Sequence, residues 1–140
     1  MTWLCDTDVI SETGRDVPDP SVLRFVASLD RLRASAVTYF EIASGIARLR
    51  EGRRRRFLTA WLAALDAGVL DVVALDRAVA RVASELDAAA RSTGRPIELR
   101  DLLILATART HGLGVATRNV AHFRGRGVRI HDPFTGTEHA

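Results

Sequence analysis

The sequence predicts an α/β fold in which a mostly parallel central sheet is flanked by helices, in a three-layer sandwich. Short apolar runs with strand character alternate along the chain with longer segments that have helical spacing. This alternation is typical of parallel sheets, because each connecting helix has to cover one face of the sheet. The chain has 140 residues, 47% of them hydrophobic, which is the size of one ordinary domain. We therefore expect a single domain spanning residues 1–140.

The first half of the chain contains two predicted strands and four predicted helices. The strands are 3–5 and 34–37, and the helices are 7–12, 21–29, 38–50 and 53–67. The third helix is expected to begin at Thr38, because Thr38 and Glu41 have the spacing of a capping box, and Gly52 follows its end.

The second half continues the alternation. A strand is predicted at 71–75, followed by a helix from Asp76 to Thr93 that Gly94 ends. A further helix has Asp101 in its first turn and an apolar run at 102–106, so it should be buried. Two short strands complete the pattern at 113–116 and 128–130, the second at an edge of the sheet and followed by an irregular tail.

The charge of the chain favours an anionic partner. The net charge is +3 and the pI is near 10.3, and nucleic acid is the first anionic partner that such a charge indicates. All 20 basic residues are arginine. The absence of lysine excludes a Walker A phosphate loop and a Schiff-base enzyme, since each needs a lysine.

The apolar segments indicate a cytoplasmic protein that is not inserted in a membrane. No stretch approaches the roughly 20 apolar residues that cross a bilayer, and Asp6 interrupts the N-terminus before a signal-peptide core forms. The single cysteine, Cys5, lies in an apolar run and is expected to be a buried hydrophobic residue rather than a nucleophile.

Polar side chains, two of them acidic, follow the predicted strands. Asp6 comes after the first strand, Glu41 after the second, and Asn119 after the strand at 113–116. Sites in parallel sheets form beyond the carboxyl ends of the strands, and Asp101 at its helix start can face them. Three carboxylates in one place repel each other unless a hard cation such as Mg²⁺ or Mn²⁺ neutralises them. Carboxylates and such a metal are sufficient for phosphodiester hydrolysis.

Each of these acids also has a purely structural interpretation. Asp6 fits a helix N-cap, and Asp8 and Asp101 are acids that a helix dipole favours in a first turn. Glu41 fits the last position of the capping box. Of the histidines, His122 and His131 are expected to be surface or structural residues rather than catalytic ones.

Two further features suggest interaction surfaces. The run Arg53, Arg54, Arg55 and Arg56 fits either a solvated helix face or a contact with RNA phosphates or an acidic partner segment. The aliphatic and aromatic residues between Tyr39 and Leu65 exceed what one core needs, which suggests a dimer face or a groove for a partner.

Four segments in order along the chain resemble the motifs of VapC-type PIN domains, the toxins of bacterial toxin–antitoxin pairs. These segments are 4–12 (LCDTDVISE), 35–46 (SAVTYFEIASGI), 94–108 (GRPIELRDLLILATA) and 111–123 (HGLGVATRNVAHF). The resemblance continues to 132–134, so it covers nearly the whole chain. Any one motif is weakly specific, whereas the ordered set is strongly specific.

The resemblance implies an endoribonuclease with an Mg²⁺ site, Mn²⁺ being the alternative metal. Its catalytic acids carry over to Asp6, Glu41 and Asp101, which together with Asn119 would bind the metal. Thr117 resembles the hydroxyl residue beside that site, and Asp8 would complete the polar shell.

The resemblance also implies partners, and the sequence departs from the family pattern at three positions. The partners are an RNA substrate, a cognate VapB-like antitoxin through which alone DNA would be bound, and a second copy of the chain in a homodimer. Asp8 stands where the family usually has asparagine. An acid is frequent at the position of Asn119 or of His122, so the charge available for a second metal is reduced.

Two other functions remain open at this point. Asp6-Thr7-Asp8-Val9 has the Asp-x-Asp form that opens haloacid-dehalogenase-like phosphatases, although the missing lysine argues against that enzyme class. The other is a non-catalytic subunit with a PIN-like fold in a DNA-binding regulatory complex.

Overall fold

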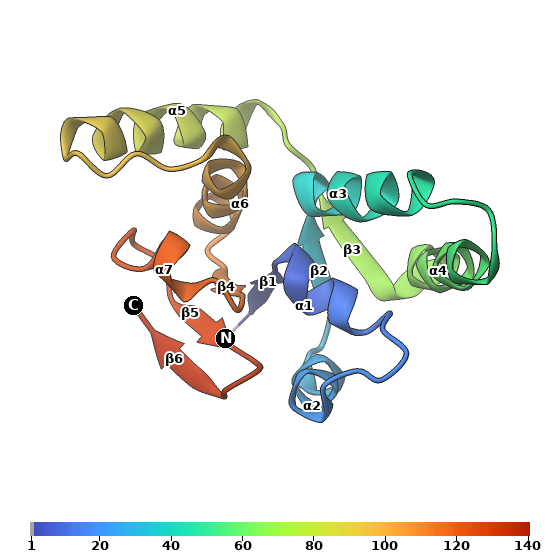
Figure 1. Cartoon of the computed structure of the whole chain (residues 1–140). Coiled ribbons are helices and arrows are strands. Elements are labelled where there is room, and N and C mark those ends of the chain that lie inside the picture. Colours follow the sequence, from blue (N-terminus) through green and yellow to red (C-terminus); the bar gives the residue numbers. More distant parts are fainter. Residues whose placement is uncertain (1) are drawn as a thin grey trace.

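The computed structural model describes residues 2–140 and contains one six-stranded sheet in the order β3-β2-β1-β4-β5-β6 (Figure 1). Neighbouring strands are parallel except for β6, which runs antiparallel to β5. The strands are β1 (Trp3–Cys5), β2 (Leu32–Ser35), β3 (Leu70–Val73), β4 (Gly114–Ala116), β5 (Ile130–Asp132) and β6 (Thr137–His139). The predicted α/β class with a mostly parallel sheet is confirmed.

Helices connect the strands and cover both faces of the sheet. They are α1 (Thr7–Glu12), α2 (Pro20–Ser28), α3 (Ala36–Ala47), α4 (Arg53–Ala64), α5 (Arg77–Ser92), α6 (Leu99–Thr110) and α7 (Val120–Phe123), and a π-helical segment, Leu65–Val69, continues α4. Within residues 2–140, no helix combines the length and the apolar character that crossing a membrane requires.

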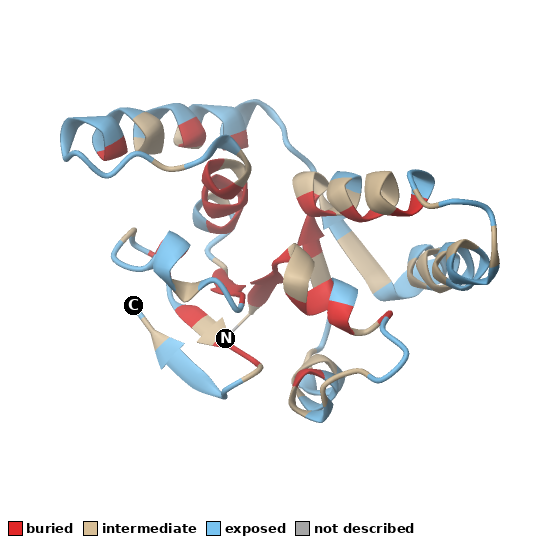
Figure 2. Cartoon of the chain, in the orientation of Figure 1, coloured by how far each residue is buried: buried red, intermediate tan, exposed pale blue. Residues whose placement is uncertain are grey.

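Side chains of the central strand β1 alternate between two cores, as the pleat of a strand requires. Trp3 and Cys5 pack with the buried faces of α1, α2 and α3, whereas Leu4 packs with Ile104 and Leu105 of α6 on the opposite face. The buried residues form a continuous centre around β1, and the outer faces of α4 and α5 are exposed (Figure 2). The ends of β1 and β4 thus lie within this buried centre.

Helix α3 begins two residues earlier than the sequence predicted, so the capping box at Thr38 is wrong. Ser35 is the N-cap, since its hydroxyl oxygen accepts a hydrogen bond from the Thr38 N–H at 3.0 Å. Strand β2 consequently ends at Ser35 rather than at residue 37. Glu41 therefore lies in the second turn of α3 and has no capping role.

The regions before β3 and after β4 also differ from the prediction. The helix predicted to residue 67 ends its α-helical part at Ala64, and the backbone turns at Gly68, whose φ of 137° suits glycine. The last strand of the prediction, 128–130, is displaced to Ile130–Asp132. It is not an edge strand, because β6 pairs with it through a tight turn at Gly136.

Candidate active site

The centre of the site is Asp6, which follows β1 and is fully buried. Strands β1 and β4 are paired, and the Asp6 N–H donates to the Ala116 carbonyl at 2.8 Å. The next residue of that strand, Thr117, is also fully buried, and its hydroxyl donates to Asp6 Oδ2 at 2.8 Å. Asp6 Oδ1 accepts from the Thr7 N–H at 2.7 Å, so Asp6 caps α1 as well. Both oxygens of this carboxylate are thus fixed by the fold.

Three carboxylates converge on the guanidinium group of Arg100, each through a different nitrogen. Nη2 lies 2.7 Å from Asp6 Oδ1, Nε lies 2.5 Å from Glu41 Oε2, and Nη1 lies 2.5 Å from Asp101 Oδ1. Asp6 comes from the end of β1, Glu41 from α3, and Asp101 from the first turn of α6. The structure therefore brings the three predicted acids together around one positively charged group.

Hydroxyl and imidazole groups complete this cluster. Thr7 Oγ1 donates to Glu41 Oε1 at 2.7 Å and accepts from Arg100 Nη2 at 3.0 Å. On the other side, His122 Nδ1 lies 2.8 Å from Asp101 Oδ2. His122 was expected to be surface or structural, and it does contact the cluster while its side chain stays half exposed.

Asp8 lies beside Asp6 with one carboxylate oxygen uncompensated. Its Oδ2 accepts from the Arg118 N–H at 2.9 Å, whereas Oδ1 is buried without a hydrogen-bond partner among the described residues. Burial, followed by the charge of Asp6, raises the pKa of Asp8 from 3.8 to about 6. A positive charge entering this region would therefore be stabilised.

Burial also explains Cys5. It raises the pKa of the Cys5 thiol to about 12, and the charges of Asp6 and Asp8 act in the same direction. Cys5 is fully buried, as predicted, and a thiol with a raised pKa stays protonated at neutral pH, which makes it a poor nucleophile.

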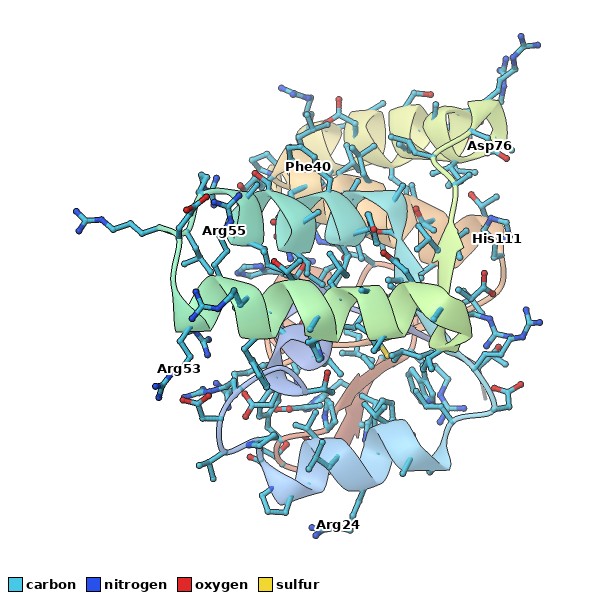
Figure 3. The ribbon with its side chains drawn as sticks, turned by 90° about the vertical axis from the view of Figure 1, so that its right-hand side faces the viewer. Arg24, Phe40, Arg53, Arg55, Asp76 and His111 are labelled. Atoms are coloured by element: carbon cyan, nitrogen blue, oxygen red, sulfur yellow. The ribbon has the colours of Figure 1, made fainter. Side chains whose placement is uncertain are left out.

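Other predicted residues lie outside the cluster. Asn119 is exposed, and it reaches the site through its backbone N–H, which donates to Thr117 Oγ1 at 3.0 Å. The four arginines Arg53, Arg54, Arg55 and Arg56 begin α4, where Arg53 and Arg55 lie at one end of the helix (Figure 3). Arg54 pairs with the exposed Asp16 at 3.8 Å. A metal contact by Asn119 and an RNA contact by these arginines stay predictions.

The donor set fits a hard divalent cation. Within residues 2–140, no three His, Cys, Asp or Glu side chains already have a metal-binding arrangement. The nitrogens of Arg100 stand between the carboxylates instead. Carboxylate oxygens are nevertheless the ligands that Mg²⁺ and Mn²⁺ prefer, and Asp6, Glu41 and Asp101 all face one cationic position. The unpartnered oxygen of Asp8 adds negative charge nearby.

Two residues of the cluster were missed from the sequence, Thr7 and Arg100. A signal existed for Arg100, because it lies in the first turn of α6, where the helix dipole disfavours a cation. An arginine at such a position suggests a nearby anion that compensates for the dipole. Thr7 offered no comparable signal, since a threonine early in a helix is ordinary.

Known proteins share this fold over nearly the whole chain. The family model for the PIN domain matches residues 3–125. VapC ribonuclease Y4jK of Sinorhizobium fredii is 35% identical over 92% of this chain and 95% of its own. Toxin FitB of Neisseria gonorrhoeae is 32% identical over 94% of this chain and 97% of its own. The crystal structure of DNA-bound VapBC from Salmonella typhimurium superposes with a TM-score of 0.80, with 25% identity, over 95% of this chain and 98% of that chain. This chain therefore belongs to the PIN-domain family, among its VapC-type members.

Proposed function

We propose that this chain is a divalent-metal-dependent endoribonuclease that acts as the toxin of a toxin–antitoxin pair. The observation that carries this proposal is the convergence of Asp6, Glu41 and Asp101 on one cationic position at the carboxyl edge of the sheet. The relatives support the reaction class, because one is named a ribonuclease and the other a toxin.

The residues divide the work of the site as follows. Asp6 and Asp101, both buried, supply the charges that hold the cation, which is Mg²⁺ with Mn²⁺ as the alternative. Glu41 is less buried and is oriented by Thr7, so it positions the cation or the attacking water. When bound, the metal supplies Lewis acidity toward the phosphate and lowers the pKa of water.

Thr117 has a positioning role. Its hydroxyl donates to Asp6 and accepts from the Asn119 N–H, so it links the end of β4 to the carboxylate that follows β1. This contact fixes the orientation of Asp6 because both side chains are fully buried. Asn119, which is exposed next to this contact, would complete the polar shell through its side-chain carbonyl oxygen.

The proposed partners are an RNA substrate, a VapB-like antitoxin and a second copy of the chain. Structural similarity to a DNA-bound VapBC complex supports an antitoxin that mediates contact with DNA. An excess of positive charge favours approach to RNA phosphates. The exposed Phe40 on α3 and Phe57 on α4 provide apolar surface for a homodimer or for the antitoxin. Such a protein acts in the cytoplasm, where RNA is available.

The purified chain provides the test. Labelled single-stranded RNA should be cleaved with Mg²⁺ or Mn²⁺ and left intact with EDTA. Asp101→Asn should abolish cleavage while circular dichroism shows an unchanged fold. Cleavage that persists in EDTA, or that survives Asp101→Asn at the wild-type rate, would contradict the proposal.

The family assignment excludes one of the two alternatives, and the cleavage experiment tests the other. Membership of the PIN-domain family sets aside the phosphatase of the haloacid-dehalogenase type, which Asp6 and Asp8 alone suggested. A non-catalytic regulatory subunit would bind its antitoxin but cleave no RNA with either metal. We favour the nuclease because the three acids share one position, which a purely regulatory fold does not need.

A further inference from the structure

Arg100 has features that an ordinary surface ion pair lacks. Its guanidinium contacts a different carboxylate with each of its three nitrogens, and one of these carboxylates, Asp6, is fully buried. Burial alone would lower the pKa of Arg100, but hydrogen bonding to Glu41 and the charge of Asp6 raise it above its ordinary value. The arginine is thus a permanent cation in the middle of the cluster.

A single positive charge leaves this cluster under-neutralised. Asp6, Glu41 and Asp101 carry three negative charges when ionised, and Asp8 lies close to Asp6. A divalent cation supplies twice the charge of a guanidinium in a smaller volume, so it suits clustered carboxylates better. Arg100 and a metal would need the same carboxylate oxygens, and both cannot use them at once.

A groove beside the cluster could accept the Arg100 side chain if a metal displaced it. Its side chain is 26% exposed, so it reaches the cluster from the surface. Together with Glu41 it lines a groove between α3 and α6 whose other residues are apolar, namely Ala36, Val37, Phe40, Leu75, Leu99 and Leu103. Long arginine stems pack along apolar surface while the charged end stays in water. A rotation of the side chain within this groove would therefore free the carboxylates without unfolding α6.

We propose that Arg100 is a built-in competitor of the catalytic cation, which holds the carboxylate cluster together in the metal-free protein and leaves it when a divalent metal binds. This inference rests on the proposed metal site. Arg100 stabilises the metal-free fold and weakens metal binding, so the protein takes up metal only when the free concentration is high enough to displace the guanidinium.

Metal affinity tests this directly, with Mn²⁺ as the probe and isothermal titration calorimetry as the measurement. Arg100→Met keeps the length of the stem and removes the charge, so it should bind Mn²⁺ at least about tenfold more tightly than wild type, equivalent to about 1.4 kcal/mol. Arg100→Lys keeps one charge but cannot bridge three carboxylates, and should lie between the two. Arg24→Met removes the same charge from an exposed position on α2, far in sequence from Arg100, and should bind as wild type does (Figure 3).

The outcomes are distinct. Equal or weaker Mn²⁺ binding by Arg100→Met overturns the competition, while the metal site itself survives. Failure of wild type and both Arg100 variants to bind Mn²⁺ overturns the metal site and the competition together. If Arg100→Met does not fold without metal, Arg100→Lys decides, since binding no tighter than wild type would exclude displacement.

An independent readout follows the arginine itself. In wild type without metal, the Nε–H of Arg100 is bonded to Glu41 and should exchange slowly with water in a ¹⁵N NMR spectrum. Saturating Mg²⁺ should shift this signal and accelerate its exchange. A signal that stays unchanged while Mg²⁺ binds would show that the guanidinium remains in place.

Discussion

Replacing Thr117 with valine would remove one hydroxyl from the centre of the site and leave its shape almost unchanged. In the wild-type protein that hydroxyl donates to Asp6 Oδ2 at 2.8 Å and accepts from the Asn119 N–H at 3.0 Å. Asp6 and Thr117 are both fully buried, so water cannot replace the missing donor. The variant therefore leaves a buried carboxylate oxygen without its partner.

The expected magnitude follows from this geometry. A hydrogen bond to a charged group contributes about 1.5–3 kcal/mol, and a buried acceptor that loses its donor costs a similar amount. The unfolding entropy of a domain of this size is about 0.3 kcal/mol/K near its midpoint. Thr117→Val should therefore lower the melting temperature by about 5–10 °C.

Thr117→Ser is the matched control, because it keeps the hydroxyl and loses only a methyl group, worth about 0.8 kcal/mol. Urea unfolding in EDTA measures both free energies of unfolding without a contribution from metal. Titration with Mn²⁺ should then show weaker binding for valine than for serine, because Asp6 Oδ2 has lost the donor that orients it. The reasoning is refuted if Thr117→Val unfolds within about 0.5 kcal/mol of wild type, the ordinary effect of a neutral substitution, or if serine is as destabilising as valine.

Three further perturbations test other parts of the molecule. Burial and the charge of Asp6 raise the pKa of Asp8 from 3.8 to about 6, so the folded protein binds this proton more tightly than the unfolded chain does. The proton on Asp8 therefore stabilises the fold below pH 3.8, and this contribution is lost as the pH rises through 6. In EDTA, Asp8→Asn should thus be more stable than wild type at pH 8, by up to about 3 kcal/mol, and equal to it near pH 4; urea unfolding that shows the same difference at both values would contradict this. Gly114→Ala should destabilise the fold by an overpacking cost of about 1–3 kcal/mol, because the new methyl would lie 2.6 Å from Trp3 Cε3. The melting temperature should fall accordingly, and an unchanged melting curve would mean that Trp3 moves freely. Neutralising Arg53–Arg56 in pairs should reduce the slope of log Kd against log salt for RNA binding by about one for each lost phosphate contact. Binding is measured in EDTA to prevent cleavage, and an unchanged slope would mean that the four arginines form a solvated helix face.

The alternation of strands and helices could be predicted from the sequence because it depends on local spacing. Apolar runs at 3–5 and 113–116 identified the two central strands, and Gly94 correctly marked the end of α5. Strand β6 was missed because its residues are polar and mostly exposed at a sheet edge, so they carry no apolar alternation. Its pairing depends on the turn at Gly136, which a sequence pattern does not distinguish from a tail.

The start of α3 could not be decided from the sequence, because two residues there have the features of an N-cap. Ser35 and Thr38 are both good N-caps, and each is followed by residues compatible with a helix. In the structure Ser35 has both roles, because it is the last residue of β2 that pairs with β3 and its hydroxyl caps α3. The cap decided the role of Glu41, which contacts the cluster instead of closing a capping box.

By itself the sequence determined where each acid stands relative to a strand or a helix start. From these positions Asp6, Glu41 and Asp101 were predicted to gather at one edge of a parallel sheet. Only the tertiary structure decided what they gather around. Arg100 neighbours Asp101 in sequence, but 94 residues separate it from Asp6, and its side chain fits between the carboxylates because α3, α6 and β1 meet there. Local spacing records which faces a segment buries, whereas the partner of a charged group depends on which distant segments surround it, since the electrostatic energy is set by distance in space.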